Sequence, residues 1–247
     1  MNKIHIGTMG WSYKFWADSF YPKGLEVERF LSEYSKHFDT VEVDSTFYRI
    51  PSESTISKWK EQTPDGFLFS AKFPRTITHE KMLRDCEEQT ERFIDRVSRL
   101  QDKLGPLLLQ FPKTFTTKHV RLLQDFLVSL PEGYRFAVEV RNTSLLNEEF
   151  YSLLRENRVA LALLDRQSMP QMETVTADFI YLRWEGDRKK VMGTLGRVEV
   201  DRTNEIEGWA EKIHRFLENS EVFGYFSKYY SGYPPSDAKQ VLRALTS

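Results

Sequence analysis

The 247-residue sequence contains a single cysteine, Cys86, and only five histidines. One cysteine cannot form an intrachain disulfide, and by itself it cannot build a thiolate metal site. No apolar run approaches the roughly 20 residues that a transmembrane helix needs, and residues 1–8 lack the charged start and apolar core of a signal peptide. These absences predict a protein of the reduced cytoplasm with no membrane partner.

The sequence has no large excess of either positive or negative charge, because 35 basic and 36 acidic residues leave a net charge of −1. The chain therefore has no global attraction to nucleic acid or to anionic membranes, and polyanion binding would need a local patch. With 40% hydrophobic and 29% charged residues, the composition is that of a soluble globular protein with an adequate core. The length suits one large domain or two small ones.

Short strand-like runs alternate with helical patterns along almost the whole chain. The expected strands are Lys3–Met9, the first half of Thr40–Pro51, Phe67–Phe73, Leu107–Phe111, Arg135–Val140, Val159–Asp165, Phe179–Trp184 and Glu221–Ser227. The expected helices are Val27–His37, Glu53–Gln62, Leu83–Leu104, His119–Leu127, Glu148–Asn157, Glu205–Glu218 and Ser236–Leu245. Gly105 is expected to end the longest of them.

This alternation predicts a parallel sheet with helical crossovers, and eight units in this length match a (β/α)8 TIM barrel of the α/β class. We expect one domain over residues 1–247. The connection Arg166–Ala177 is weak for helix and contains Pro170, so it is expected to be irregular. A doubly wound open sheet is the alternative, weakened by the lack of a glycine-rich dinucleotide turn.

The expected strands end in unusually polar residues, and in TIM barrels the chemistry lies where strands end. In Thr40–Pro51, Glu42 and Asp44 alternate with valines, so both carboxylates face the same side of the strand. The same spacing pairs Glu139 with Arg141 and, on the seventh strand, Arg183 with Glu185. We therefore expect these charges to meet at the C-terminal end of the barrel.

The candidate site follows from these positions. The candidate catalytic residues are Glu42, Glu139 and Asp165. The candidate substrate-binding residues are Trp11, Tyr13, Asp44, Tyr48, Lys72, His79, Arg141, Arg183, Glu185 and Lys228. Carboxylates can act as general acid or base, Lys and Arg can hold an anion, and aromatic rings can stack on a sugar-like ligand.

Other site chemistries find little support in the sequence. Of the histidines, only His79 is expected near the barrel mouth, so the sequence predicts no imidazole-based metal centre. A hard cation held by Asp44, Glu139, Asp165 and Glu185 stays open. The sequence contains neither a Gly-x-Ser-x-Gly nucleophile motif nor a Walker-type phosphate loop, and it identifies no cofactor.

Seven segments carry long, specific motifs: IGTMGWSYKFW, FYPKG, DTVEVDSTFYRIPSESTISKW, TPDGFLFSAKFPRTITHE, KLGPLLLQFP, AVEVRN and ADFIYLRWEG. Together they resemble the YecE-like family of uncharacterised DUF72 proteins over Ile4 to about Tyr233. The resemblance implies a TIM barrel and no particular reaction.

The chain departs from the family pattern at three places, which points to a divergent branch with a modified ligand. Asp44 stands where the family usually has Asn. Asn142–Leu145 replaces the usual His-Pro-Ser-Trp, and Phe226–Gly232 lacks the usual Asn pair, as Ser236–Ala238 lacks the usual Asn-Ala.

Three functions stay open at this stage. The first is an enzyme, a hydrolase, lyase or isomerase, acting on a small acidic or phosphorylated sugar-like molecule; a glycosidase version would use Glu139 and Glu185. The second is a nucleic-acid-binding or nuclease-like protein that uses basic residues near the seventh strand: Arg183, Arg188, Lys189, Lys190, Arg197 and Arg202. The third is a non-catalytic barrel whose charges form a structural ion-pair network.

Overall fold

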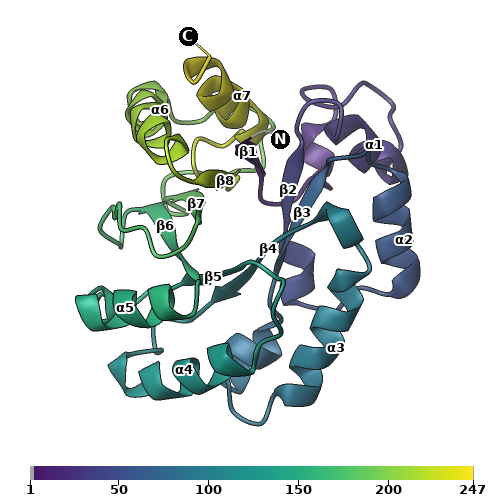
Figure 1. Ribbon diagram of the computed structural model, residues 1–247. Helices are drawn as coiled ribbons and strands as arrows, with labels where there is room; N and C mark the ends of the chain where they lie inside the picture. The colour runs from purple at the N-terminus through teal and green to yellow at the C-terminus, as the bar shows by residue number, and fades with distance from the viewer. Residues whose placement is uncertain (1–2, 247) are drawn as a thin grey trace.

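Eight parallel strands form one sheet in the order β1-β8-β7-β6-β5-β4-β3-β2, and helices surround it as a ring (Figure 1). The computed structural model describes residues 3–246, so the predicted domain ends at residues 1, 2 and 247 lie outside the described part. The strands are β1 (Ile4–Thr8), β2 (Thr40–Val43), β3 (Leu68–Lys72), β4 (Leu104–Gln110), β5 (Phe136–Glu139), β6 (Ala160–Arg166), β7 (Phe179–Gly186) and β8 (Glu221–Phe226). The α-helices are α1 (Phe30–Tyr34), α2 (Glu53–Glu61), α3 (Glu87–Ser98), α4 (Val120–Ser129), α5 (Glu148–Glu156), α6 (Thr203–Leu217) and α7 (Pro234–Ala244).

The sheet closes on itself between its first and last members, β1 and β2. Gly10 N–H donates to the Glu42 carbonyl oxygen at 2.8 Å, and a parallel bridge joins Met9 to Glu42. A Cβ on Gly7 would lie 2.2 Å from the Thr40 carbonyl oxygen, so only glycine permits this approach. The TIM barrel is therefore confirmed, and the open doubly wound sheet is wrong.

Each strand presents one face to the helices and the other to the barrel interior, as the period-2 pattern requires. The interior combines small residues on β5 and β6 with large ones on β7 and β8. Its buried apolar members are Met9, Leu108, Ala137, Ala160, Ala162, Leu164, Met169, Phe179, Tyr181, Phe223 and Tyr225. The small side chains leave room for the larger ones of the strands that follow, so the interior is filled rather than open.

The expected helix Leu83–Leu104 is wrong at both ends. Helix α3 covers only Glu87–Ser98 because Leu83 and Asp85 have left-handed φ values of 69° and 46°, which an α-helix cannot contain. Gln101, at φ 58°, lies beyond its C-terminal end. Gly105 does not end a helix; it belongs to β4, where an added Cβ would lie 3.3 Å from the Phe69 carbonyl oxygen of β3.

The connection between β6 and β7 contains no helix, which confirms the expectation for Arg166–Ala177. Its Thr176 hydroxyl accepts from Leu161 N–H and donates to the Val159 carbonyl oxygen, both at 2.7 Å, so a side chain of this connection satisfies backbone groups at the start of β6. Nowhere between residues 3 and 246 is there a helix with the length and apolar character needed to span a membrane.

Candidate functional site

Arg183 lies at the centre of a cluster of charged side chains at the C-terminal ends of the strands. Its Nη2 donates to Glu42 Oε1 at 2.7 Å and its Nε to Glu42 Oε2 at 3.0 Å. Its Nη1 donates to Glu139 Oε2 and, at 2.7 Å, to Glu185 Oε1. One guanidinium thus bridges carboxylates from β2, β5 and β7, all on inward-facing positions.

A second layer of the cluster lies closer to solvent. Arg141 Nε donates to Glu139 Oε1 and its Nη2 to Glu185 Oε1, both at 2.7 Å. Arg166 Nη1 donates to the other oxygen of Glu185. The pairs Glu139 with Arg141 and Arg183 with Glu185 therefore share faces, as the sequence spacing predicts.

Burial and charge move the pKa values of the two inner carboxylates in opposite directions. Glu42 is fully buried, and burial raises its pKa despite the attraction of Arg183. Burial acts in the same sense on Glu139, but the surrounding guanidiniums and the Lys72 ammonium outweigh it and lower the pKa of Glu139 to about 2. Glu139 is therefore a fixed carboxylate at neutral pH, whereas Glu42 holds its charge less firmly.

The arginines of the cluster differ in how many N–H groups are in use. Arginine has five N–H donors, and those of Arg183 meet Glu42, Glu139, Glu185 and the Met9 sulfur, the last at 3.3 Å. Arg183 thus has no donor to spare. Arg141 uses only Nε and one N–H of Nη2 in these bonds, and its side chain is 22% exposed.

Three further predicted residues lie beside the bonded cluster. Asp44, 37% exposed, approaches Arg183 to 3.9 Å. Lys72 is buried, with its Nζ 4.0 Å from the centre of the Phe47 ring. His79 packs edge-on against the same ring, and partial burial and then the positive charges of Lys72 and Arg141 lower its pKa to about 4. His79 is therefore neutral at physiological pH.

The predicted aromatic and basic rim is only partly assembled. Tyr13 lies 5.6 Å from the Lys228 Nζ, and burial followed by the charge of Asp44 raises its pKa. Tyr48 is 74% exposed. Trp11 packs edge-on against Trp59 of α2, on the helix side of the barrel, so it does not belong to the cluster.

Asp165 is the predicted catalytic residue that the structure places elsewhere. Its Oδ2 accepts from Trp209 Nε1 at 2.7 Å and from the Tyr230 hydroxyl at 3.1 Å. Leu164 points into the barrel, so its neighbour Asp165 must face the helix layer. The expectation that Asp165 shares a cavity with Glu42 and Glu139 is therefore wrong, because successive residues of a strand face opposite sides of the sheet.

The same alternation of inward- and outward-facing residues identifies two site residues that the sequence reasoning missed. Arg166, two residues after Leu164, points inward and binds Glu185. Tyr181, two residues before Arg183, donates from its hydroxyl to Glu42 Oε2 at 2.6 Å. Strict period-2 counting along β6 and β7 could have found both. Phe47 is the last residue of the 3-10 helix Asp44–Phe47 that follows β2, where no periodic pattern in the sequence predicts its position.

The described residues contain no group of three His, Cys, Asp or Glu side chains arranged to hold a metal ion. In the charge cluster, the carboxylates of Glu42, Glu139 and Glu185 all bind guanidinium groups instead. This pairing does not fit the hard-cation site that the sequence left open.

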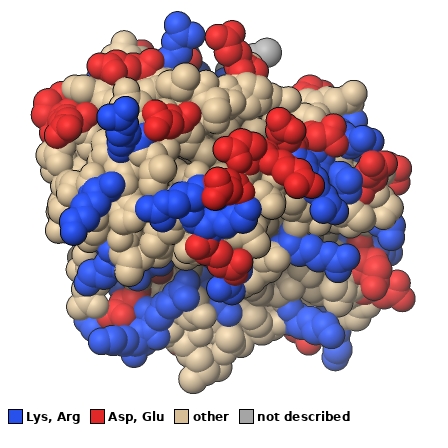
Figure 2. All heavy atoms as spheres, turned by 90° about the horizontal axis from the view of Figure 1, so that it is seen from below, with Lys and Arg blue, Asp and Glu red and all other residues tan. Residues whose placement is uncertain are grey.

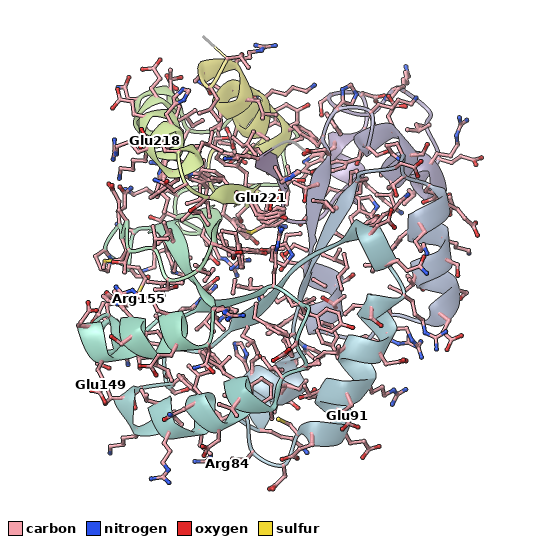
Figure 3. All side chains as sticks on the ribbon, in the orientation of Figure 1. Arg84, Glu91, Glu149, Arg155, Glu218 and Glu221 are labelled. Atoms are coloured by element: carbon pink, nitrogen blue, oxygen red, sulfur yellow. The ribbon has the colours of Figure 1, made fainter. Side chains whose placement is uncertain are left out.

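A hollow of about 1240 Å³ lies at the opposite, N-terminal end of the barrel. Its lining includes Glu221, which Figure 3 shows inside the ring of helices. Part of the charge there is paired: His5 lies 2.8 Å from Asp39 and 3.1 Å from Glu221, which also binds Arg135 at 2.7 Å. We locate the candidate site at the C-terminal end despite this hollow, because Arg141 keeps unused N–H donors there and the Lys72 Nζ has no ion pair within residues 3–246.

The basic residues behind the nucleic-acid hypothesis do not act as one group. Arg183 is buried in the cluster, and Arg202 pairs with Glu205 at 2.8 Å. On the face shown in Figure 2, acidic and basic side chains are intermixed rather than gathered in one basic stripe. That face does not offer the continuous positive surface that a nucleic acid requires.

Comparison with known sequences places the chain among uncharacterised proteins. Residues 5–247 match the family model described as "Protein of unknown function DUF72". The UPF0759 protein YunF of Bacillus subtilis (strain 168) is 31% identical over 273 aligned positions, which cover 98% of this chain and 94% of YunF. The UPF0759 protein YecE of Escherichia coli (strain K12) is 38% identical over 139 positions, 56% of this chain, so the match spans about half of that relative, 48% of its length.

Solved structures agree with the fold. A DUF72 family protein from Thermotoga maritima MSB8 superposes with a TM-score of 0.84 at 26% identity over 99% of both chains. Xylanase XynB from Paenibacillus barcinonensis gives a TM-score of 0.54 at 10% identity, with 97% of this chain and 95% of that chain covered, and shares the fold alone. Because the family model spans nearly the whole sequence and YunF aligns along its length, the chain belongs to the DUF72 family.

Proposed function

We propose that this protein is an enzyme that acts on a small acidic or phosphorylated, sugar-like molecule at the C-terminal end of its barrel. We also propose a cytoplasmic location, because the chain has a single, buried cysteine and does not depend on disulfides. The location of the charge cluster supports the first proposal, since TIM-barrel enzymes carry their active sites at this end.

The observation that carries the proposal is the incomplete pairing of Arg141. Its side chain is 22% exposed at the barrel mouth, and part of its guanidinium has no acceptor among residues 3–246. A phosphate or carboxylate can take two guanidinium N–H groups at once in charge-assisted bonds. Arg183 was expected to share this task, but its donors are all in use, so its role here is to neutralise the inner carboxylates.

The accessible groups also narrow the chemistry. Glu139, whose pKa is lowered to about 2, cannot serve as a general acid near neutral pH. Glu139 and Glu185 share both Arg141 and Arg183, so the glycosidase version of the hypothesis, which needs one protonated carboxyl group, loses support. Asp44 and the neutral His79 are the partly exposed groups that can exchange protons with a substrate.

The test is the change in melting temperature on adding inorganic phosphate and a panel of sugar phosphates at low salt. A ligand at 100 times its Kd stabilises by about 2.7 kcal/mol, which is readily measured. We expect the shift in the wild type and in Arg155→Gln, which removes an exposed arginine of α5 (Figure 3), and a clearly smaller shift in Arg141→Gln. An equal shift in both variants would place the anion elsewhere, and no shift with any ligand would overturn the proposal.

A further inference from the structure

Lys72 differs from every other cation of the charge cluster. Arg141, Arg166 and Arg183 each bind at least one carboxylate, whereas the Lys72 Nζ has no hydrogen bond or ion pair within residues 3–246. The residue is only 7% exposed, and its Nζ contacts the Phe47 ring at 4.0 Å from the centroid. An ammonium held in this way is costly to bury.

A second buried lysine shows how this fold otherwise accommodates an ammonium. Lys103 is 6% exposed, and its Nζ donates to the Lys60 and Thr63 carbonyl oxygens at 2.9 and 2.7 Å and to Thr63 Oγ1 at 3.2 Å. Each N–H of Lys103 can thus meet an acceptor, which is the arrangement of a structural lysine. Lys72 is as deeply buried and has none of these bonds.

The backbone of Lys72 is nevertheless held firmly. Its N–H donates to Thr46 Oγ1 at 3.1 Å, and the same hydroxyl lies 2.7 Å from its carbonyl oxygen. The residue ends β3 on the inward face, so its stem starts from a rigid strand. A lysine whose backbone is held rigidly and whose Nζ makes no hydrogen bond is arranged as expected of a reactive group rather than a structural one.

The surroundings of Lys72 lower the pKa of its ammonium group. Burial lowers its pKa, and the positive charge of Arg183 lowers it further, while the carboxylates of Asp44, Glu139 and Glu42 act in the opposite direction. His79, on the segment after β3, is neutral itself and adds no positive charge at physiological pH. A lysine desolvated beside another cation is an activated nucleophile.

We propose that Lys72 is a catalytic nucleophile that forms an imine with the carbonyl group of an anionic, sugar-like aldehyde or ketone. This inference rests on the proposed function, in which Arg141 holds the anionic end of the same molecule. The partly buried Phe47 ring must turn away from Nζ to admit the substrate. Phe47 is the last residue of a short 3-10 helix, Asp44–Phe47, beside the exposed Tyr48, so rotation of its ring leaves the strands and α-helices in place.

The step balances without an oxidant or reductant. The Nζ lone pair attacks the carbonyl carbon, the C=O π electrons move to oxygen, and that oxygen takes up a proton while the nitrogen releases one. The hydroxyl of the resulting carbinolamine takes up a second proton and leaves as water, the nitrogen lone pair forms the C=N bond, and loss of the second nitrogen proton gives the imine, so amine and carbonyl become imine and water. His79 and Asp44 flank this position and can carry the protons. A protonated imine withdraws electrons from the neighbouring carbon, which favours a lyase or an isomerase.

The experiment uses glycolaldehyde phosphate as the probe and uncharged glycolaldehyde as its matched control. The full-length protein is incubated with each aldehyde, sodium borohydride reduces any imine to a stable amine, and peptide mass mapping locates the label. We expect most of the label from glycolaldehyde phosphate on Lys72, with little on the buried Lys103 or the exposed Lys118. The labelling rate of Lys72 should reach its plateau at a lower pH than that of Lys118, which a structural lysine would not show.

Variants separate this inference from the proposed function. Lys72→Met should lose the label while its circular dichroism spectrum stays that of the wild type, and Lys72→Gln serves if the methionine variant does not fold. In Arg141→Gln, Lys72 should still react with glycolaldehyde but lose its preference for the phosphorylated probe. Thermal stabilisation by phosphate with no label on Lys72 would refute the imine and leave the anion site standing. Equal labelling of Lys72 by both aldehydes would support the nucleophile and refute the anion-holding role of Arg141.

Discussion

Glu139→Gln tests whether the inner charge cluster stabilises the fold. The fully buried carboxylate accepts from Arg183 Nη1 and, at 2.7 Å, from Arg141 Nε. Glutamine keeps the shape and one acceptor oxygen but removes the negative charge, and its NH2 group turns donors toward two guanidinium groups. We therefore expect a large loss of stability, because each arginine loses a charged partner.

Two estimates of the loss in the free energy of unfolding agree. Lowering the pKa of Glu139 from 4.5 to about 2 corresponds to about 3 kcal/mol at about 1.36 kcal/mol per pKa unit. Removing one partner of a buried ion pair typically costs about 3–5 kcal/mol. Since Arg183 keeps Glu42 and Glu185 as partners, we expect the lower end of that range, about 3 kcal/mol.

Urea denaturation at neutral pH measures the loss of stability in Glu139→Gln. Glu149→Gln, on the outer surface of α5 (Figure 3), is the control, and its stability should stay within about 0.5 kcal/mol of the wild type.

The pH dependence of this loss provides a second check. A carboxyl group whose pKa is lowered by folding stabilises the protein above its unfolded value of 4.5, and this contribution disappears as the pH falls toward about 2. The difference between wild type and Glu139→Gln should therefore shrink over this range. Equal stability at neutral pH, or a difference independent of pH, would refute the reasoning.

Two further substitutions probe the interior of the barrel. Tyr181→Phe removes the 2.6 Å bond to Glu42, and since hydrogen bonds to charged groups contribute about 1.5–3 kcal/mol, thermal denaturation should show a loss of about 2 kcal/mol; an unchanged melting temperature would contradict this. At the other end, burial lowers the pKa of His5, but Asp39 and Glu221 outweigh it and raise the pKa. This contribution is complete below the unfolded value of 6.5 and is lost as the pH rises through the folded pKa, so the stability advantage of wild type over His5→Phe should be larger at about pH 5 than at about pH 9. An advantage that grew with pH would show that His5 is neutral.

The fold could be predicted from the sequence because its signals are local and repeated. Each strand from β1 to β8 carries its own alternating or apolar run, and the irregular Pro170 segment shows its lack of helical pattern directly. The ends of α3 could not be found in this way. The apolar face from Leu83 to Leu104 continues past the helix, and only the left-handed backbone conformations in the structure show where the helix stops.

The candidate site could be predicted only as far as the alternation of side chains along each strand shows which residues face the barrel interior. Glu42, Glu139 and Arg183 were found because each alternates with outward-facing apolar residues. Position at a strand end alone misplaces Asp165, because its neighbour Leu164 faces the barrel interior and Asp165 therefore faces the helices. Which cation has a partner cannot be inferred from sequence, since pairing depends on distances between side chains of different strands, and only the structure shows that Lys72 lacks one.

Glu42 contributes both to the closure of the barrel between β1 and β2 and to the charge cluster. Its carbonyl oxygen accepts the Gly10 N–H that joins β1 to β2, while its carboxylate accepts from Arg183 and Tyr181. Local unfolding that detaches β1 from β2 must therefore also disturb a carboxylate fixed by buried donors. The join between the first and second strands, though short, belongs to the same cooperative unit as the charge cluster. We therefore expect fraying of the N-terminal strand and disassembly of the barrel mouth to occur together.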